Sequence, residues 1–280
     1  MTVALVTDST SSLTDEEANA AQIEIVRLQV VIGADVFTEG KDVTADMVSG
    51  ALARYVPVST SRPTPDDFGA AYERAAKAGA TEIVSIHLSS KMSGTFDSAL
   101  LAAKSARVPV TCVDSGQVGI ATGYAALRAA VVRDDGGTVK AVADAARKAG
   151  QNSYTLFYVD TLEYLKRGGR VGAAAALIGS ALAVKPLLTV RDGMIAPLEK
   201  VRTAAKALAR LEALVVERAG TFEEGFDIGV QHLANPTVAA SVAGRLQTSL
   251  DVEEITVREV GASIGAHVGP GMIAVNLTPR

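Results

Sequence analysis

The chain has 280 residues, of which 48% are hydrophobic and only 4% aromatic, with no tryptophan. This length exceeds one ordinary domain, so we expect two domains that each bury a core. The 27 basic and 31 acidic residues leave a formal net charge of −4, which excludes the basic stripe that a nucleic-acid-binding protein uses to neutralise phosphates.

Strand patterns alternate with helix patterns in the first half of the chain. Four apolar or β-branched runs are predicted as strands, at residues 3–6, 23–32, 82–88 and 108–113. Two helix starts are clear, because Thr14 with Glu17 forms a capping box and Thr64 stands before a proline and two acidic residues. Strands that alternate with helices of this length predict an α/β domain built on a mostly parallel sheet.

The second half follows a different pattern. Strands are predicted at residues 155–159, 185–190, 194–201, 226–233, 254–260 and 272–277. Asp192-Gly193 is the best hairpin signal, and adjacent strands without a helix between them imply a mixed or antiparallel sheet. We therefore predict an N-terminal parallel-sheet α/β domain over residues 1–152 and a C-terminal α+β domain over residues 153–280.

The chain carries no pattern of an exported or redox-active protein. Its first residues lack the basic and longer apolar stretches of a secretory signal, and no apolar run is long enough to span a bilayer. The single cysteine, Cys112, lies in an apolar run typical of a buried strand, so we interpret it as a small hydrophobic residue. We expect a cytoplasmic protein.

Four loops are dense in small polar residues, at residues 8–10, 59–63, 89–95 and 114–115. Ligands of open α/β sheets bind at the carboxyl ends of strands, so we expect these loops to gather on one rim. The loop at 89–95 leads into a helix, whose free N–H groups and dipole favour an anion, and Gly94 permits close approach of the backbone. Ordinary helix capping by Ser93 explains the same residues without a ligand.

The three histidines differ in their surroundings. His87 and His232 lie at strand ends without metal-ligand spacing, so both are interpreted as structural. His267 lies among three glycines and Pro270, a pattern that predicts a fixed turn before the last strand, and we interpret it as functional. The residues alone indicate an anion or carboxylate site between two α/β domains.

Ordered pieces along the chain resemble the DegV family of bacterial fatty-acid-binding proteins. They are Val6-Thr7-Asp8-Ser9-Thr10, Thr60-Ser61-Arg62-Pro63, residues 88–95, Val113-Asp114-Ser115, residues 162–170, Lys185-Pro186, Lys200-Val201-Arg202-Thr203 and Ala266-His267-Val268-Gly269-Pro270-Gly271. One such piece would be weak, whereas the ordered set is specific. The resemblance implies an acyl chain buried in a tunnel between the two domains.

The resemblance also implies roles for particular residues. The carboxylate of a long-chain fatty acid such as palmitate would be held by the hydroxyls of Thr60 and Ser93, with His267 in the same network. The neighbours in that pocket would be Ser61, Gly94 and Thr95. Arg62 departs from the glutamine expected in its loop, so the contacts of that position are open.

Family members act as acyl carriers for a fatty acid kinase, which phosphorylates the bound carboxylate for phospholipid synthesis. The resemblance therefore implies a protein that is not an enzyme, needs no metal or cofactor, and has such a kinase as its partner. Arg170 and Arg202 are candidate docking residues for that kinase, because both are interpreted as exposed cations near the mouth of the pocket.

Simple energetics agree with a carrier. A C16 tail has about 14 methylenes, and their burial at about 0.8 kcal/mol each contributes on the order of 10 kcal/mol. The costs of ordering and association cancel much of this, so submicromolar binding is a reasonable ceiling. The uncharged stretch at residues 173–183 is interpreted as a helix that lines the tail tunnel or packs in a core, and both are equally supported.

Two alternatives stay open. Ser93 and His267 could serve a hydrolase or acyltransferase, although the Gly-x-Ser-x-Gly elbow is absent around Ser93. The helix start near Ser93 could instead bind a small anion or a nucleotide, although a P-loop is absent.

Overall fold

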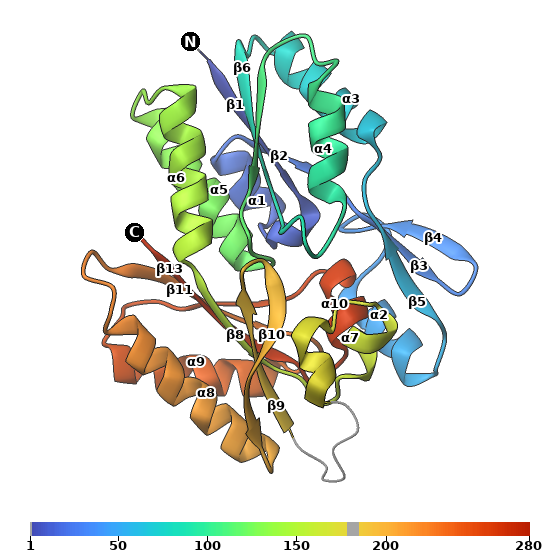
Figure 1. The fold of residues 1–280 in the computed structure, drawn as a ribbon, viewed down its shortest axis with the longest axis vertical. Helices are drawn as coiled ribbons and strands as arrows, with labels where there is room; N and C mark the ends of the chain where they lie inside the picture. The colour runs from blue at the N-terminus through green and yellow to red at the C-terminus, as the bar shows by residue number, and fades with distance from the viewer. Residues whose placement is uncertain (1, 178–184) are drawn as a thin grey trace.

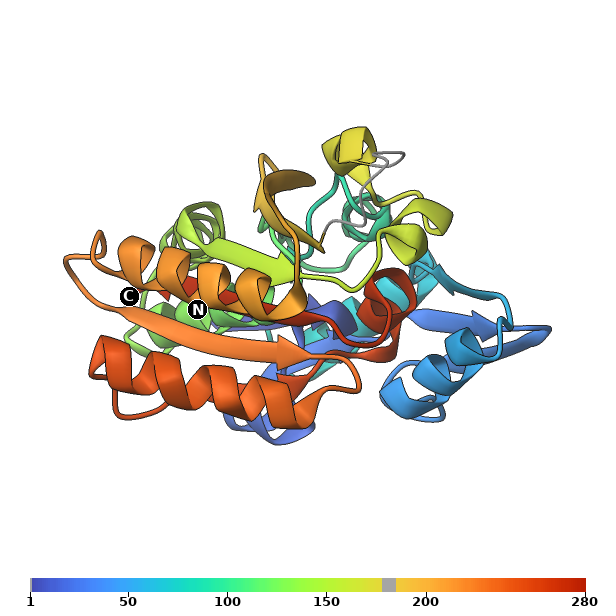
Figure 2. The same ribbon diagram turned by 90° about the horizontal axis from the view of Figure 1, so that it is seen from below.

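Two β-sheets with helices on their faces form most of the structure, and a small third sheet projects beside them (Figures 1 and 2). The computed structural model describes residues 2–177 and 185–280. The uncharged stretch predicted as a helix at 173–183 therefore lies partly outside the described residues. Its described part belongs to a short 3-10 helix, η2 (Gly172–Leu177).

The first sheet is parallel throughout, with strand order β2-β1-β6-β7. Its strands are β1 (Val3–Asp8), β2 (Ile23–Val26), β6 (Glu82–His87) and β7 (Val110–Asp114). One face is covered by α3 (Pro65–Lys77) and α4 (Thr95–Ala103), and the other by α5 (Ile120–Asp134) and α6 (Val139–Asn152). Because both faces are covered, β1 is apolar at consecutive positions instead of alternating.

The helix starts of this half follow the sequence signals. Thr14 and Glu17 form the predicted capping box at α1 (Asp15–Ala20), and Thr64 with Asp67 forms another at α3. Cys112 is half-buried in β7, and burial raises the pKa of its thiol to about 11, as for a structural thiol.

The small sheet was not predicted. It contains β3 (Gln29–Ile32), β4 (Asp35–Thr38) and β5 (Val58–Ser61) in the antiparallel order β4-β3-β5. The run predicted as one strand at 23–32 is divided between two sheets, and most of the loop predicted at 59–63 is strand β5. Together with α2 (Ala45–Ala53), the small sheet packs on α10 (Ala262–Val268) through a shared apolar cluster.

The second large sheet is mixed, with strand order β10-β9-β8-β13-β11-β12. Its strands are β8 (Tyr154–Tyr158), β9 (Lys185–Arg191), β10 (Met194–Val201), β11 (Phe226–His232), β12 (Thr256–Glu259) and β13 (Ile273–Pro279). The predicted hairpin joins β9 to β10, where Asp192 and Gly193 have φ of 51° and 76°. Helices α8 (Ala204–Ala219) and α9 (Pro236–Leu250) cover one face.

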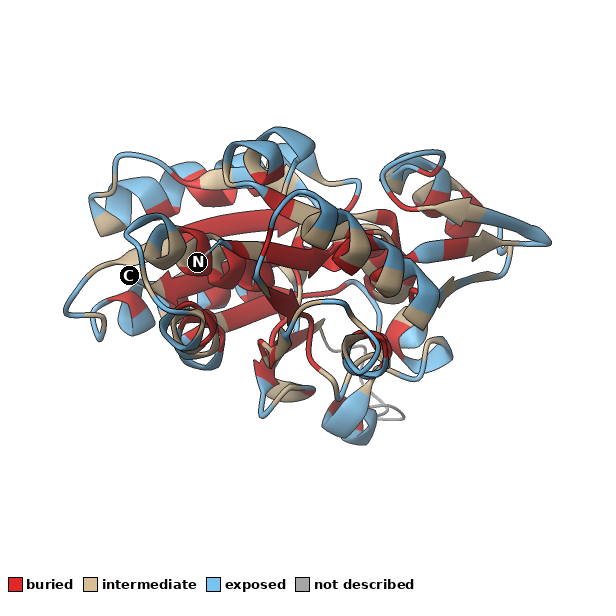
Figure 3. Cartoon of the chain, turned by 90° about the horizontal axis from the view of Figure 1, so that it is seen from above, coloured by how far each residue is buried: buried red, intermediate tan, exposed pale blue. Residues whose placement is uncertain are grey.

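The other face of the mixed sheet points toward the first half of the chain. Helix α5 lies between the two large sheets, since it contacts β1 on one side and β13 on the other. Tyr124 of α5 donates to the carbonyl of Ile228 at 3.0 Å, and Arg258 pairs with Glu17 at 2.6 Å. Figure 3 shows the buried residues concentrated along the strands of the large sheets. The mixed α/β architecture with a parallel N-terminal sheet is confirmed.

Among the described helices, none combines the length and the apolar character that a membrane span requires.

Candidate functional site

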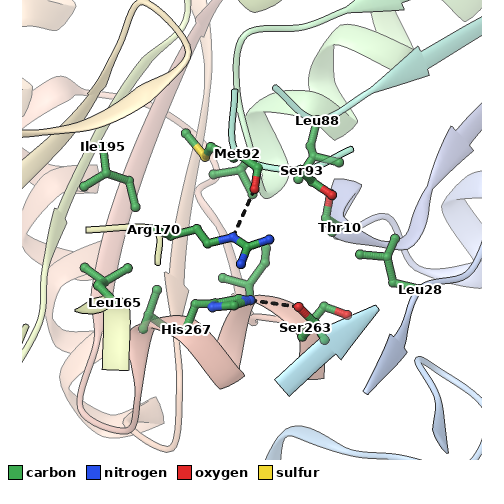
Figure 4. Close-up of a pocket in the computed structure, with 14 residues that line it drawn as sticks. Thr10, Leu28, Leu88, Met92, Ser93, Leu165, Arg170, Ile195, Ser263 and His267 are labelled. Atoms are coloured by element: carbon green, nitrogen blue, oxygen red, sulfur yellow. Dashed lines mark hydrogen bonds between the residues drawn. The ribbon is translucent and has the colours of Figure 1, made fainter. Parts of the chain in front are cut away.

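A pocket lies where the parallel sheet, the small sheet and α10 meet (Figure 4). Most of its walls are aliphatic side chains or methionine. Its polar lining residues are Thr10, Thr60, Ser93, Arg170, Ser263 and His267. Figure 4 shows Arg170 and His267 side by side, opposite Thr10, Leu88 and Ser93 from the first half of the chain.

Two of the predicted loops meet in this pocket because they follow neighbouring parallel strands. Thr10 follows β1, and Ser93 follows β6. The buried carboxylate of Asp8 joins the two loops, since it accepts hydrogen bonds from the backbone N–H groups of Thr10 at 3.0 Å and Leu88 at 3.1 Å. His87 also contacts this carboxylate, through Nδ1 at 3.0 Å, so its structural interpretation fits its surroundings.

The two predicted residues of the loop after β7, Asp114 and Ser115, do not line the pocket, although Val118 of the same loop does. Asp114 instead lines a separate opening, where it accepts hydrogen bonds from the N–H groups of Ser90 at 3.2 Å and Gly116 at 2.8 Å. Its carboxylate therefore shapes the preceding loop without lining the pocket.

Thr60 reaches the pocket from β5 and bonds to His267. The Thr60 Oγ1 and His267 Nε2 atoms are 2.9 Å apart. The predicted turn around His267 is wrong, because this residue lies in the last turn of α10. The glycines suggested a loop, but they let the helix pack closely: a side chain at Gly265 would crowd Leu233 at 3.2 Å.

Burial and the nearby Arg170 guanidinium lower the pKa of His267 to about 4, so its imidazole is neutral at neutral pH. Its Nδ1 atom is buried and has no hydrogen-bond partner among the described residues. An unpaired ring acceptor costs less here than an unpaired buried N–H, so we assign the hydrogen to Nε2. His267 then donates to Thr60, and the hydroxyl hydrogen of Thr60 stays available to a ligand.

Gly168 explains how the end of α7 (Glu163–Arg167) fits against this histidine. A Cβ atom at position 168 would lie 2.1 Å from His267 Nδ1. The glycine pair that follows α7 is therefore needed for close packing at Gly168 and for a positive φ of 71° at Gly169.

Ser93 lies directly before α4 but does not cap it. Gly94 is the N-cap residue, and it forms no side-chain capping bond. Ser93 Oγ lies 2.8 Å from Thr95 Oγ1 and accepts a hydrogen bond from the N–H of Thr95 at 3.3 Å. The hydroxyl thus lines the pocket beside a helix N-terminus, which is favourable for an anion.

The remaining residues implied in carboxylate binding lie around the polar end of the pocket. Ser61 is exposed, and Thr95 is fully buried. Arg62 donates to the Gly94 carbonyl at 3.5 Å, and a Cβ atom at Gly94 would lie 1.9 Å from its guanidinium. Neither Ser61, Gly94 nor Thr95 lines the pocket itself.

Arg170 is placed differently from its prediction as an exposed cation. It is half-buried in the pocket wall, and its Nε donates to the Met92 carbonyl at 3.1 Å. Among the described residues that line the pocket, Arg170 is the one with a formally charged side chain. Arg202 is exposed directly after β10 and does not line the pocket.

Glu39 supports α10 from the small sheet and was missed in the sequence. Its buried carboxylate accepts hydrogen bonds from the N–H of Ser263 at 2.7 Å and from the hydroxyl of Ser9 at 2.5 Å. Burial raises the pKa of Glu39. No local pattern marks this residue, because its partners lie 30 and 224 positions away.

A second cavity adjoins the pocket. The two share the lining residues Val118, Ile195, Ile264 and Val268, and the second adds apolar residues from the mixed sheet. Apolar side chains thus lie between the pocket and a second cavity that is lined in part by strands of the mixed sheet.

The geometry does not pair Ser93 with His267. Each is bonded to a threonine instead, and within the described residues no acid contacts Nδ1 of His267. The described residues also contain no cluster of three or more metal-binding side chains. His232 lies outside the pocket, where its Nδ1 accepts from the N–H of Asn235 at 3.4 Å.

Comparisons with known proteins cover the whole chain. A family model described as an uncharacterised protein of the DegV family matches residues 2–280. A DegV domain-containing protein from Streptomyces coelicolor is 48% identical over 99% of both chains. A crystal structure described as DegV, a fatty acid binding protein from Bacillus subtilis, has a TM-score of 0.92 and 31% identity over 100% of both chains. A DegV family protein from Thermus thermophilus, described for its fatty acid binding, has a TM-score of 0.92 and 29% identity over 100% of both chains.

Proposed function

Because this chain belongs to the DegV family, we propose that it binds one long-chain fatty acid between its two domains and presents the carboxylate to a fatty acid kinase. The observation that carries the proposal is one pocket that combines polar groups with aliphatic walls and adjoins a second, mostly apolar cavity. The solved relatives described as fatty acid binding support the same class of ligand.

The carboxylate is assigned to the polar end of the pocket. A buried carboxylate costs several kcal/mol unless it is paired and hydrogen-bonded. Thr60 supplies a hydroxyl hydrogen oriented by His267, and Ser93 supplies a second hydroxyl near the start of α4. Arg170 supplies the positive charge from the opposite wall. These groups together offer the hydrogen-bond donors and the positive charge that a buried carboxylate requires.

The acyl tail is assigned to the aliphatic part of the pocket and to the adjoining cavity. The two adjoining cavities share four lining residues, all of them apolar. Their shared wall is apolar, so a methylene chain is favoured there and a charged group is not. A small anion or a nucleotide has no apolar part that could fill the apolar cavity. The alternative of an anion or nucleotide site near Ser93 is therefore weaker than a fatty acid site.

For the kinase step, one oxygen of the carboxylate has to be reachable from outside the pocket. The partner would transfer the γ-phosphoryl group of ATP to a carboxylate oxygen, giving an acyl phosphate and ADP, while the carrier contributes binding and orientation. We keep Arg170 and Arg202 as the proposed docking residues. Arg202 is the better test of docking alone, since it is exposed outside the pocket.

Native mass spectrometry of the protein purified from bacteria tests the lipid assignment. We expect a fatty acid to co-purify, and the Thr60→Val/Ser93→Ala double variant to retain far less of it. The matched control is Thr248→Val/Ser105→Ala, which changes two exposed hydroxyls. A chain that stays free of lipid when offered palmitate would refute the proposal.

The kinase assignment has a separate test. The palmitate-loaded protein is mixed with ATP and a purified fatty acid kinase, and the acyl phosphate is trapped with hydroxylamine. If palmitoyl hydroxamate forms only when both proteins are present, the result supports presentation of the carboxylate to the kinase. Absence of the hydroxamate with a loaded carrier would leave lipid binding intact but remove the kinase step.

A further inference from the structure

The second cavity follows β13 away from His267. Ala274 and Asn276 lie on the same face of this strand and both line the cavity. Two residues of a β-strand span about 7 Å, so the cavity runs from the small side chain at 274 to the amide at 276. His267 and Val268 line the first pocket just before this strand. A tail that enters beside His267 therefore passes Ala274 before it reaches Asn276.

The deep end of the cavity is polar. Thr155, Gln231 and Asn276 all line it, and their exposed fractions are 4%, 2% and 1%. The ladder places Asn276 opposite Thr155 and Ala274 opposite Gln231. Three buried polar side chains thus close a cavity whose other walls are mostly apolar.

These side chains are satisfied by the protein itself. Thr155 Oγ1 lies 2.8 Å from the side-chain amide of Asn276 and 2.8 Å from that of Gln117. Gln231 accepts from the N–H of Ile120 at 3.0 Å and donates to Ser12 Oγ at 3.0 Å. The network joins the mixed sheet to α5 and to the loop after β1, so it cannot move without disturbing the contact between the two halves.

We infer that Thr155, Gln231 and Asn276 form an end wall that sets the longest acyl tail the protein accepts, an inference that rests on the proposed function. A methyl group can end against a wall whose polar atoms are already paired. A longer tail has to displace the wall, and this separates buried hydrogen-bonding groups that then lack partners.

Two variants change the cavity in opposite directions. Ala274→Leu fills the passage before the wall, and Asn276→Ala shortens the side chain that closes it. Ala274→Leu does not remove a member of the polar network. It therefore still tests the end wall if Asn276→Ala does not fold. Val257→Leu on the exposed part of β12 is the matched control for an added apolar group.

The experiment measures dissociation constants for lauric, myristic, palmitic, stearic and arachidic acids by displacement of a fluorescent fatty acid. In the wild type we expect affinity to rise with chain length up to a maximum and then fall. Each pair of methylenes excluded from the cavity should weaken binding by about tenfold. Ala274→Leu should therefore move the maximum to shorter acids, and Asn276→Ala should move it to longer ones.

The outcomes separate the two proposals. Absence of binding by the wild type to every acid refutes the proposed function. Wild-type binding with the same length profile in Ala274→Leu and in every folded Asn276→Ala sample refutes the end wall.

Discussion

The Thr60 hydroxyl and the His267 imidazole are 207 positions apart in the chain and 2.9 Å apart in space. This bond joins the small sheet to the last turn of α10 at the polar end of the pocket. Neutral His267 donates through Nε2, so Thr60 keeps its own hydrogen for the ligand. The pair therefore acts as one oriented donor.

Replacing His267 should weaken palmitate binding without unfolding the protein. In His267→Ala the Thr60 hydroxyl loses its oriented partner, and we expect a cost of about 1–3 kcal/mol in binding free energy. Isothermal titration calorimetry measures it. His232→Ala, which changes a histidine outside the pocket, should bind palmitate as the wild type does. Equal loss in both variants would contradict a specific role for His267.

The protonation of His267 should occur at unusually low pH. Its pKa in the folded protein is lowered to about 4 from an ordinary value of 6.5. The stability that follows from this difference is fully present above pH 6.5 and is lost as the pH falls through about 4, on the order of a few kcal/mol in total. NMR titration of the His267 ring measures the pKa directly. A midpoint near 6.5 would show that the ring is not shielded as described.

Arg170 should contribute charge to the pocket as well as shape. Arg170→Gln removes the guanidinium, so we expect palmitate affinity to fall by about tenfold and its dependence on salt to decrease. The same change should raise the pKa of His267, because the Arg170 charge helps to lower it. Arg202→Gln is the control, since this residue lies outside the pocket. An unchanged His267 titration would contradict the proximity of the two groups.

Glu39 should give the opposite dependence of stability on pH. Burial raises its pKa above the ordinary value of 4.5, so its contribution is fully present below pH 4.5 and is lost as the pH rises through the raised value. Glu39→Gln should remove this slope from the free energy of unfolding, measured by urea denaturation between pH 4 and 8. Glu16→Gln, on an exposed residue, should leave the slope in place.

Gly168→Ala should damage the pocket through a single added methyl group. That group would lie 2.1 Å from His267 Nδ1, so the imidazole has to move away from Thr60. We expect palmitate binding to weaken by at least about tenfold, as for a lost buried hydrogen bond. Gly244→Ala in α9 meets nothing within 4 Å and should bind normally. Normal binding by Gly168→Ala would contradict the close packing at His267.

Local signals account for much of the fold. The capping residues Thr14 and Thr64 and the turn at Asp192-Gly193 specify their elements through neighbours in sequence, and the structure confirms them. The small sheet gave no such signal, because β3 pairs with β5 across 26 residues or more and its strands have only four residues each. Short, half-exposed strands lack the long apolar run that makes a strand visible in sequence.

The site could be predicted only in part from the sequence, because some of its residues depend on contacts with distant parts of the chain. Ser93 and Thr10 could be placed on one rim because both follow parallel strands. His267 was assigned to a turn, since its glycines argue against the helix that tertiary packing stabilises. Arg170 and Glu39 depend on distant partners, and no local pattern shows which charged side chains become buried.

The position of the small sheet determines what is lost when the chain is cut into two fragments. This sheet is encoded in the first half of the chain, yet it packs on α10 near the C-terminus. A fragment that ends at residue 152 keeps Thr60 and loses His267, and the complementary fragment does the reverse. A chimera that joins the first half of one relative to the second half of another must therefore match the small sheet to the α10 it receives, or the polar end of the pocket is lost even where both halves fold.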